Sequence, residues 1–286
     1  MSTLSRRNFL KITGTAAVAT AFGTPYLAHA ARPYGKLNMG IQSYSLRHFS
    51  FDEAIAKINA LGLHYVELFP GHLSHDASAA EWKEAQKKMS DLDIQCNAYG
   101  VSGFSTDEAA ARKIFDFGKA MGLDSLSASP SLDSFDLLDK LVEEYQISIS
   151  IHNHGPHDEK WGRPEQIYAA VKDHHPLIGS CADTGHFLRA DVDPVKAIQI
   201  LKGRVFGLHV KDFVSEKEEV VAGDGKLDLV ALINELYAQK FDGFASIEYE
   251  LDEESPSAGI QKGLDNVQEA LKSVKKSGLL SKLKRG

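Results

Sequence analysis

The segment Ile147–Pro156 reads ISISIHNHGP, and it sets the interpretation of the whole chain. Apolar and small polar residues alternate through Ser150, which is the period-two pattern of a β-strand. The strand then runs into His152, Asn153 and His154 before Gly-Pro ends it. A strand whose tip carries two imidazoles and an amide indicates a binding or catalytic function at that end.

The same unit, a short apolar strand followed by an amphipathic helix, repeats along the chain. The sequence predicts eight strands: Leu37–Ser43, His64–Phe69, Gln95–Tyr99, Ser125–Ala128, Ser148–His152, Ile178–Asp183, Val205–Val210 and Phe244–Tyr249. The helices predicted between and after them are Phe51–Leu61, Thr106–Met121, Leu132–Tyr145, Pro164–Lys172, Pro194–Leu201, Leu229–Gln239 and Val267–Lys275.

Eight strands that alternate with helices, at roughly thirty residues per unit, predict an α/β protein with a single-domain (β/α)₈ TIM barrel over residues 31–286. The alternative is an open, doubly wound sheet. That fold usually places a Gly-rich phosphate-binding turn after its first strand. The first strand here ends in Ile41-Gln42-Ser43-Tyr44-Ser45, without such a turn, which favours the barrel.

Metal-type ligands stand where several of these strands end. In a barrel the carboxyl ends of all strands meet at one mouth, so side chains distant in sequence converge there. Hard oxygen donors together with imidazole nitrogens suit Mn²⁺, Co²⁺ or Zn²⁺ better than Ca²⁺. The residues concerned are Glu67, His152, Asp183, His209 and Glu248.

In this order and spacing, the motifs resemble the xylose isomerase-like TIM-barrel superfamily, in its sugar phosphate isomerase/epimerase branch. The resemblance covers nearly all of the chain after residue 30. It rests on Val66-Glu67-Leu68, His152-Asn153-His154, Asp183-Thr184-Gly185-His186, Leu208-His209-Val210-Lys211-Asp212, Gly223-Asp224-Gly225-Lys226-Leu227-Asp228 and Ser246-Ile247-Glu248-Tyr249-Glu250.

The resemblance implies one divalent metal ion held by residues from strands five to eight. These are His152, Asp183, His209 and Glu248, with Mn²⁺ the ion we expect and Co²⁺, Zn²⁺ or Mg²⁺ as alternatives. The family has a Glu where this chain has His152, which puts its two-glutamate proton shuttle in doubt. Glu248 is then the expected general base, and Lys211, His186 or Glu67 is expected to return a proton or stabilise the oxyanion. Substrate contacts are expected from Gln42, Asn97, His154, His186 and Trp161.

The function we expect is that of a metal-dependent sugar isomerase or epimerase that removes a proton next to a metal-bound carbonyl and passes through an enediolate. A single strong base fits elimination equally well, so a lyase or hydratase acting on a keto-sugar or keto-glycoside is the alternative. A non-catalytic sugar-binding barrel is more remote. An endonuclease IV-type repair enzyme would need further histidines on strands two and three, where this chain has Asn97.

The first thirty residues predict a separate targeting signal. Ser5-Arg6-Arg7-Asn8-Phe9-Leu10-Lys11 matches the twin-arginine export pattern, and Ala28-His29-Ala30 offers a cleavage site. We therefore expect export through the Tat pathway to the periplasm or another extracytoplasmic location, without a stable membrane anchor.

Composition narrows the expected partners. A formal net charge of −7 argues against a nucleic-acid surface, so a small-molecule carbohydrate is the partner we expect. The oligomeric state is left open, a homo-oligomer included. Cys96 and Cys181 are expected to be buried thiols rather than a disulfide.

Overall fold

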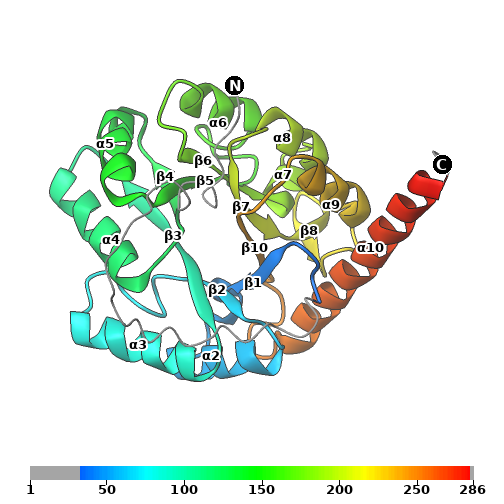
Figure 1. The fold of residues 1–286 in the computed structure, drawn as a ribbon, viewed down its shortest axis with the longest axis horizontal. Coiled ribbons are helices and arrows are strands. Elements are labelled where there is room, and N and C mark those ends of the chain that lie inside the picture. The colour runs from blue at the N-terminus through cyan, green and yellow to red at the C-terminus, as the bar shows by residue number, and fades with distance from the viewer. Residues whose placement is uncertain (1–32, 284–286) are drawn as a thin grey trace, which may run out of the picture. The chain divides into compact units, whose positions relative to one another are not determined.

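Eight parallel strands close into a barrel in the order β1-β10-β7-β6-β5-β4-β3-β2, and helices surround it (Figure 1). The computed structural model describes residues 33–283. The (β/α)₈ barrel predicted from the sequence is confirmed. The export signal predicted for residues 1–30 lies outside the described residues and stays a prediction.

The barrel strands lie close to their predicted positions. They are β1 (Asn38–Gln42), β2 (Tyr65–Leu68), β3 (Gln95–Phe104), β4 (Ser125–Pro130), β5 (Ser148–His152), β6 (Ile178–Asp183), β7 (Val205–Val210) and β10 (Phe244–Ile247). The helices are η1 (Ser43–Leu46), α2 (Phe51–Ala60), α3 (Ala79–Asp91), α4 (Glu108–Met121), η2 (Leu132–Ser134), α5 (Phe135–Tyr145), α6 (Pro164–Val171), α7 (Thr184–Arg189), α8 (Pro194–Ile200), α9 (Leu229–Ala238) and α10 (Ser257–Leu283).

Local signals explain why several helices begin and end where they do. Ser50 and Ser78 each start a helix with a reciprocal capping box, in which Glu53 or Glu81 bonds back to the serine. Gly122 ends α4 in the left-handed conformation, which glycine adopts without steric cost. The apolar faces of the helices then pack against the strands to form the main core.

Besides the short η1, two helices and a hairpin were not predicted. Helix α3 buries only Ala85 and Met89, so its apolar periodicity is weak. Helix α7 has only six residues and follows β6 directly. A hairpin of β8 (Asp212–Ser215) and β9 (Glu218–Val220) follows β7, and its charged turn contains no glycine to mark it.

Small polar side chains occupy part of the barrel interior. Ser125 and Ser150 share a 2.5 Å hydrogen bond between their hydroxyls, and Ser127 donates to the buried Glu67. Cys96 and Cys181 are both buried and unpaired with each other, as predicted. No helix in residues 33–283 has the length and hydropathy needed to cross a membrane.

Candidate metal centre and active site

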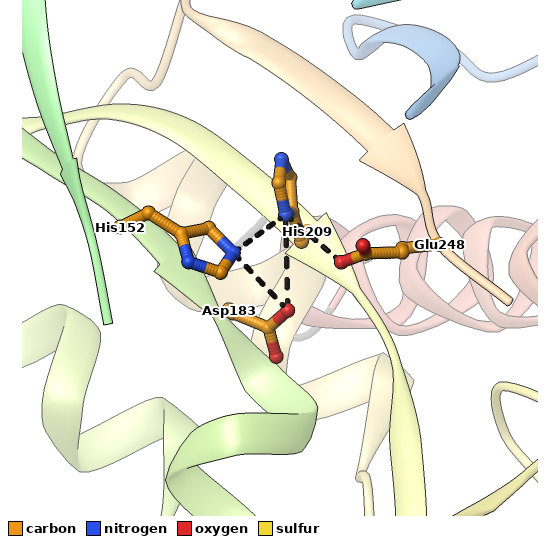
Figure 2. Close-up of side chains that lie close together, drawn as sticks. All are labelled: His152, Asp183, His209 and Glu248. Atoms are coloured by element: carbon orange, nitrogen blue, oxygen red, sulfur yellow. Dashed lines mark hydrogen bonds and ion pairs between the residues drawn. The ribbon is translucent and has the colours of Figure 1, made fainter. Parts of the chain in front are cut away.

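Four side chains from four neighbouring strands meet at the carboxyl end of the barrel (Figure 2). His152 ends β5, Asp183 ends β6, His209 lies in β7, and Glu248 directly follows β10. One potential ligand atom from each of them lies within 4.8 Å of those of the other three. The four predicted metal ligands are therefore brought together by the fold.

The atoms that face one another are ring nitrogens and carboxylate oxygens. His209 Nδ1 lies 3.0 Å from His152 Nε2 and 3.1 Å from Glu248 Oε2. Asp183 Oδ2 lies 3.6 Å from His152 Nε2 and 3.7 Å from His209 Nδ1. The dashed lines in Figure 2 trace these four approaches, and His209 takes part in three of them.

The buried polar atoms of this group fit a divalent cation. Asp183 Oδ2 and Glu248 Oε2 are buried, and neither has a hydrogen-bond partner. A buried carboxylate oxygen without a partner is costly, and two ring nitrogens 3.0 Å apart need a proton or a cation between them. Two imidazoles and two carboxylates form a donor set that suits Mn²⁺, Co²⁺ or Zn²⁺.

Asn153 fixes the tip of β6 next to His152. Its Oδ1 accepts a hydrogen bond from the backbone N–H of Asp183 at 2.8 Å, and its Nδ2 donates to the Asp183 carbonyl at 3.0 Å. The other oxygen of Asp183, Oδ1, accepts from the backbone N–H of His186 at 2.7 Å and so caps α7. Oδ2 is thereby aimed at the ring nitrogens. The sequence showed Asn153 beside the ligands but did not reveal this function.

Glu67 lies behind His209 and does not face the centre. It has no exposed surface, and its Oε2 lies 2.7 Å from His209 Nε2. Ser127 and Ser246 donate to its two oxygens at 2.5 and 3.3 Å. Both carboxylate oxygens of Glu67 are engaged beneath the ring, and the catalytic role predicted for Glu67 stays a prediction. Such a carboxylate orients the imidazole of a metal ligand.

Lys211 lies next to Glu248. Its ammonium is buried, lies 3.9 Å from Glu248 Oε2, and donates to Glu250. Burial alone would lower the pKa of Lys211, but Glu248, Asp183 and Glu250 together raise it above its ordinary value. Lys211 is therefore cationic at neutral pH, and this placement is compatible with the proton-donating role predicted for it.

His154 and His186 lie beside the centre, with their rings inclined to each other and to His152. The His152–His154 ring centroids lie 4.6 Å apart, and those of His154 and His186 lie 5.1 Å apart. Partial desolvation lowers the pKa of His154, whose side chain is 48% exposed, to about 4, and burial lowers that of His186 to about 3, so both rings are neutral at neutral pH. Arg189 Nη1 lies 3.1 Å from His186 Nδ1 and restricts the rotation of that ring. Substrate contact by either ring stays a prediction.

The other three predicted substrate contacts are placed differently. Gln42 Nε2 donates to the Gly100 carbonyl at 3.4 Å, and Asn97 is buried in β3. Trp161 is fully buried, and its Nε1 donates to the Pro130 carbonyl at 3.3 Å. These contacts give Trp161 a packing role, and no contact supports a substrate role for it.

Two further residues near the centre were not assigned from the sequence. Glu219, on the hairpin, accepts a hydrogen bond from the backbone N–H of Glu250 at 2.8 Å. Asp212 is fully buried and accepts from the backbone N–H groups of four residues at 2.8 to 3.0 Å. Those four donors are Phe213, Gly223, Gly225 and Leu227. Asp212 therefore ties the hairpin to the Gly223–Asp228 turn.

Fold and site together define a TIM barrel with a candidate metal centre at the carboxyl ends of its strands. A family model described as xylose isomerase-like TIM barrel matches residues 131–275. A solved structure of an uncharacterised protein from Parabacteroides distasonis is 30% identical, covers 82% of this chain and 99% of its own, and has a TM-score of 0.66. The chain belongs to the xylose isomerase-like TIM barrel family.

Two more distant structures share the fold. A D-tagatose 3-epimerase-like protein is 16% identical, with a TM-score of 0.70, and the match covers 84% of this chain and 98% of that protein. A 3-keto-D-glucoside 4-epimerase from E. coli is 14% identical, with a TM-score of 0.67 and coverage of 82% and 99%. No curated protein sequence matches the chain.

Proposed function

We propose that the protein is a divalent-metal-dependent sugar isomerase or epimerase. The observation that carries the proposal is the convergence of His152, Asp183, His209 and Glu248, with two buried carboxylate oxygens that lack hydrogen-bond partners. The names of the two epimerase-type structures support a carbohydrate substrate, as does membership of the family. Mn²⁺ is the ion we expect.

A bound divalent ion would polarise the carbonyl oxygen of a sugar and so acidify the carbon next to it. Glu248 takes the proton from that carbon. Burial would raise the pKa of Glu248, but the charge of Lys211 is the largest opposing influence, and the pKa lies below its ordinary value. The carboxylate is therefore in its basic form at neutral pH.

Lys211 performs the complementary step. As a cation 3.9 Å from Glu248, it stabilises negative charge that develops on a substrate oxygen and returns a proton. Delivery to a neighbouring atom or to the opposite face yields an isomer or an epimer. Glu67 holds His209 during this sequence and does not exchange protons with the substrate.

A lyase is the second candidate function. His152 occupies the strand-five position where the resemblance leads us to expect a second glutamate, so the centre has one carboxylate base facing Lys211. One base that removes a proton beside a carbonyl suffices for elimination of a β-oxygen. The product then carries a double bond or is cleaved.

Glu248→Gln tests the proposal and separates these outcomes. Ketohexoses incubated with the Mn²⁺-loaded protein in deuterated water should exchange the proton beside the carbonyl, and the variant should lose this exchange by at least about a hundredfold. Glu218→Gln, at an exposed position on the hairpin, is the matched control. Label in an intact isomer indicates an isomerase or epimerase, and an unsaturated product indicates a lyase. Undiminished exchange in Glu248→Gln would remove Glu248 as the base.

The N-terminal segment would direct export of the barrel. Residues 1–30 would act as a Tat-type signal and residues 31–286 as the exported barrel, which would acquire its metal before export. Changing Arg6 and Arg7 to Lys should hold the precursor in the cytoplasm. Normal export of that double variant would refute the Tat signal.

A further inference from the structure

We infer that the site accepts an uncharged sugar and discriminates against phosphorylated or other anionic sugars. The inference rests on the proposed sugar isomerase or epimerase function and adds the charge class of its substrate. It is carried by the side chains around the mouth between β7 and β10.

In TIM barrels the loops after the seventh and eighth strands are a frequent phosphate-binding place. Here these strands are β7 and β10. The segment from Glu248 to Pro256, which joins β10 to α10, carries five acidic residues and no Lys or Arg. They are Glu248, Glu250, Asp252, Glu253 and Glu254. The position that would receive a phosphate is therefore lined by negative charge.

The cations that approach the centre from this side are already paired. Lys211 is held between Glu248 and Glu250. Arg47, which follows η1, pairs with Glu253 and donates to the Glu250 and Tyr44 carbonyls at 3.2 Å. A phosphate group would have to displace a carboxylate from one of these cations, and no gain in charge pairing would result.

The hairpin adds negative charge next to Lys211. Glu219 hydrogen-bonds to the backbone of Glu250 and lies in the field of Glu248 and Glu250. Burial and these two carboxylates raise the pKa of Glu219 to about 7 against the opposing effect of Lys211. Burial is the largest cause of this rise, and the contact with Glu250 places Glu219 among the acidic side chains beside Lys211.

Other cations near the mouth do not reverse this balance. Arg189 donates to the Glu216 carbonyl at 2.9 Å and contacts His186. Lys217 is exposed at the hairpin turn, between Glu216 and Glu218. Lys160, on the loop after β5, is exposed next to Asp158 and Glu159.

A bound divalent ion does not neutralise the excess negative charge around the mouth. Its two charges are matched by Asp183 and Glu248, while Lys211 is matched by Glu250. Glu253 and Glu254 are then opposed by Arg47 and by the partly exposed His48, which pairs with both, while Glu219, with a pKa of about 7, carries only part of a negative charge. Sugar hydroxyl groups can donate hydrogen bonds to such carboxylates, whereas a phosphate dianion is repelled by them.

Matched pairs of sugars test the inference. The Mn²⁺-loaded protein is assayed by proton exchange and conversion with D-fructose, D-psicose and D-tagatose, and with their 6-phosphates. We expect kcat/KM to favour the unphosphorylated member of each active pair by at least about tenfold at low ionic strength. The ratio should shrink as salt screens the acidic side chains around the mouth.

A double variant and a control test whether the acidic residues after β10 cause this preference. The double variant Glu253→Gln, Glu254→Gln releases Arg47 and should improve kcat/KM for the phosphates by about fivefold while that for the free sugars changes little. Glu269→Gln, on an exposed part of α10, is the control and should change neither.

Each outcome bears on a different statement. A preference for the 6-phosphates overturns the inference and leaves the isomerase or epimerase function standing. An unchanged ratio in the double variant overturns the part assigned to Glu253 and Glu254. Failure of the protein to act on any of the six sugars overturns the proposed function and the inference with it.

Discussion

The environment of a single histidine explains why the candidate centre can bind a metal. His209 Nε2 faces Glu67 at 2.7 Å, and its Nδ1 faces Glu248, Asp183 and His152. A hydrogen bond from Nε2 to Glu67 leaves the Nδ1 lone pair for the ion, because a neutral imidazole has one donor and one acceptor nitrogen. Glu67 thus selects the nitrogen that serves the site.

Glu67→Gln should weaken metal binding. The amide retains the shape of the side chain but removes the charge that strengthens the bond to His209, so we expect a loss of about 10- to 100-fold in Mn²⁺ affinity. Competition titration against a chelator measures it, with Glu218→Gln as the exposed control. An affinity within error of the parent would show that Glu67 only fills space beneath the ring.

The β8–β9 hairpin and the turn after it depend on one buried carboxylate. Asp212 accepts four backbone hydrogen bonds, two on each carboxylate oxygen. Gly225 is required in that turn, since a Cβ there would lie 2.6 Å from Asp212 Oδ1. The turn therefore packs against the carboxylate as closely as a glycine allows.

Asp212→Ala should lower the free energy of unfolding by about 3 kcal/mol or more, because several buried N–H groups lose their acceptor. Urea denaturation followed by circular dichroism measures the change. Asp224→Ala is the matched control from the same turn; its carboxylate pairs with Lys262 at the surface, and its loss should cost at most about 1 kcal/mol. Equal costs for both variants would contradict the assigned role of Asp212.

The barrel as a whole could be predicted because its signals are local and repeated. Period-two apolar strands and glycine stops recur through the chain, and the eight strands lie close to where the pattern places them. The convergence of metal-type ligands also followed from position, since residues that end parallel strands meet at one mouth, and the family resemblance then implied which four of them would hold the ion. His152 and Asp183, for example, could be identified as site residues without knowledge of tertiary contacts.

Features set by tertiary packing could not be predicted. Glu67 and Glu248 are both glutamates at strand ends, and only the contact with His209 distinguishes the carboxylate behind the ring from the one in front of it. Trp161 follows a loop of site residues, yet its indole turns into the core. The hairpin turn contains no glycine to mark it. The hairpin is stabilised instead by the contacts of Asp212 with backbone groups up to Leu227, which the sequence does not reveal.

Metal removal should destabilise the entire barrel. An ion that binds only the folded chain contributes about 4 kcal/mol at a concentration a thousandfold above its Kd, and this corresponds to roughly 8–16 °C in Tm for a domain of this size. Thermal unfolding in Mn²⁺ and in EDTA measures the difference. A Tm that does not respond to Mn²⁺ would indicate that the four residues form a metal-free polar cluster.

Metal stoichiometry in the ligand variants provides the most direct test. Parent protein, Asp183→Ala, His209→Ala and the control Asp224→Ala are loaded with Mn²⁺, freed of excess ion and measured by elemental analysis. We expect about one ion per chain in the parent and in the control, and well below one in both ligand variants, because each removes one of four converging ligands. Equal metal content in all four proteins would contradict a metal centre at these residues.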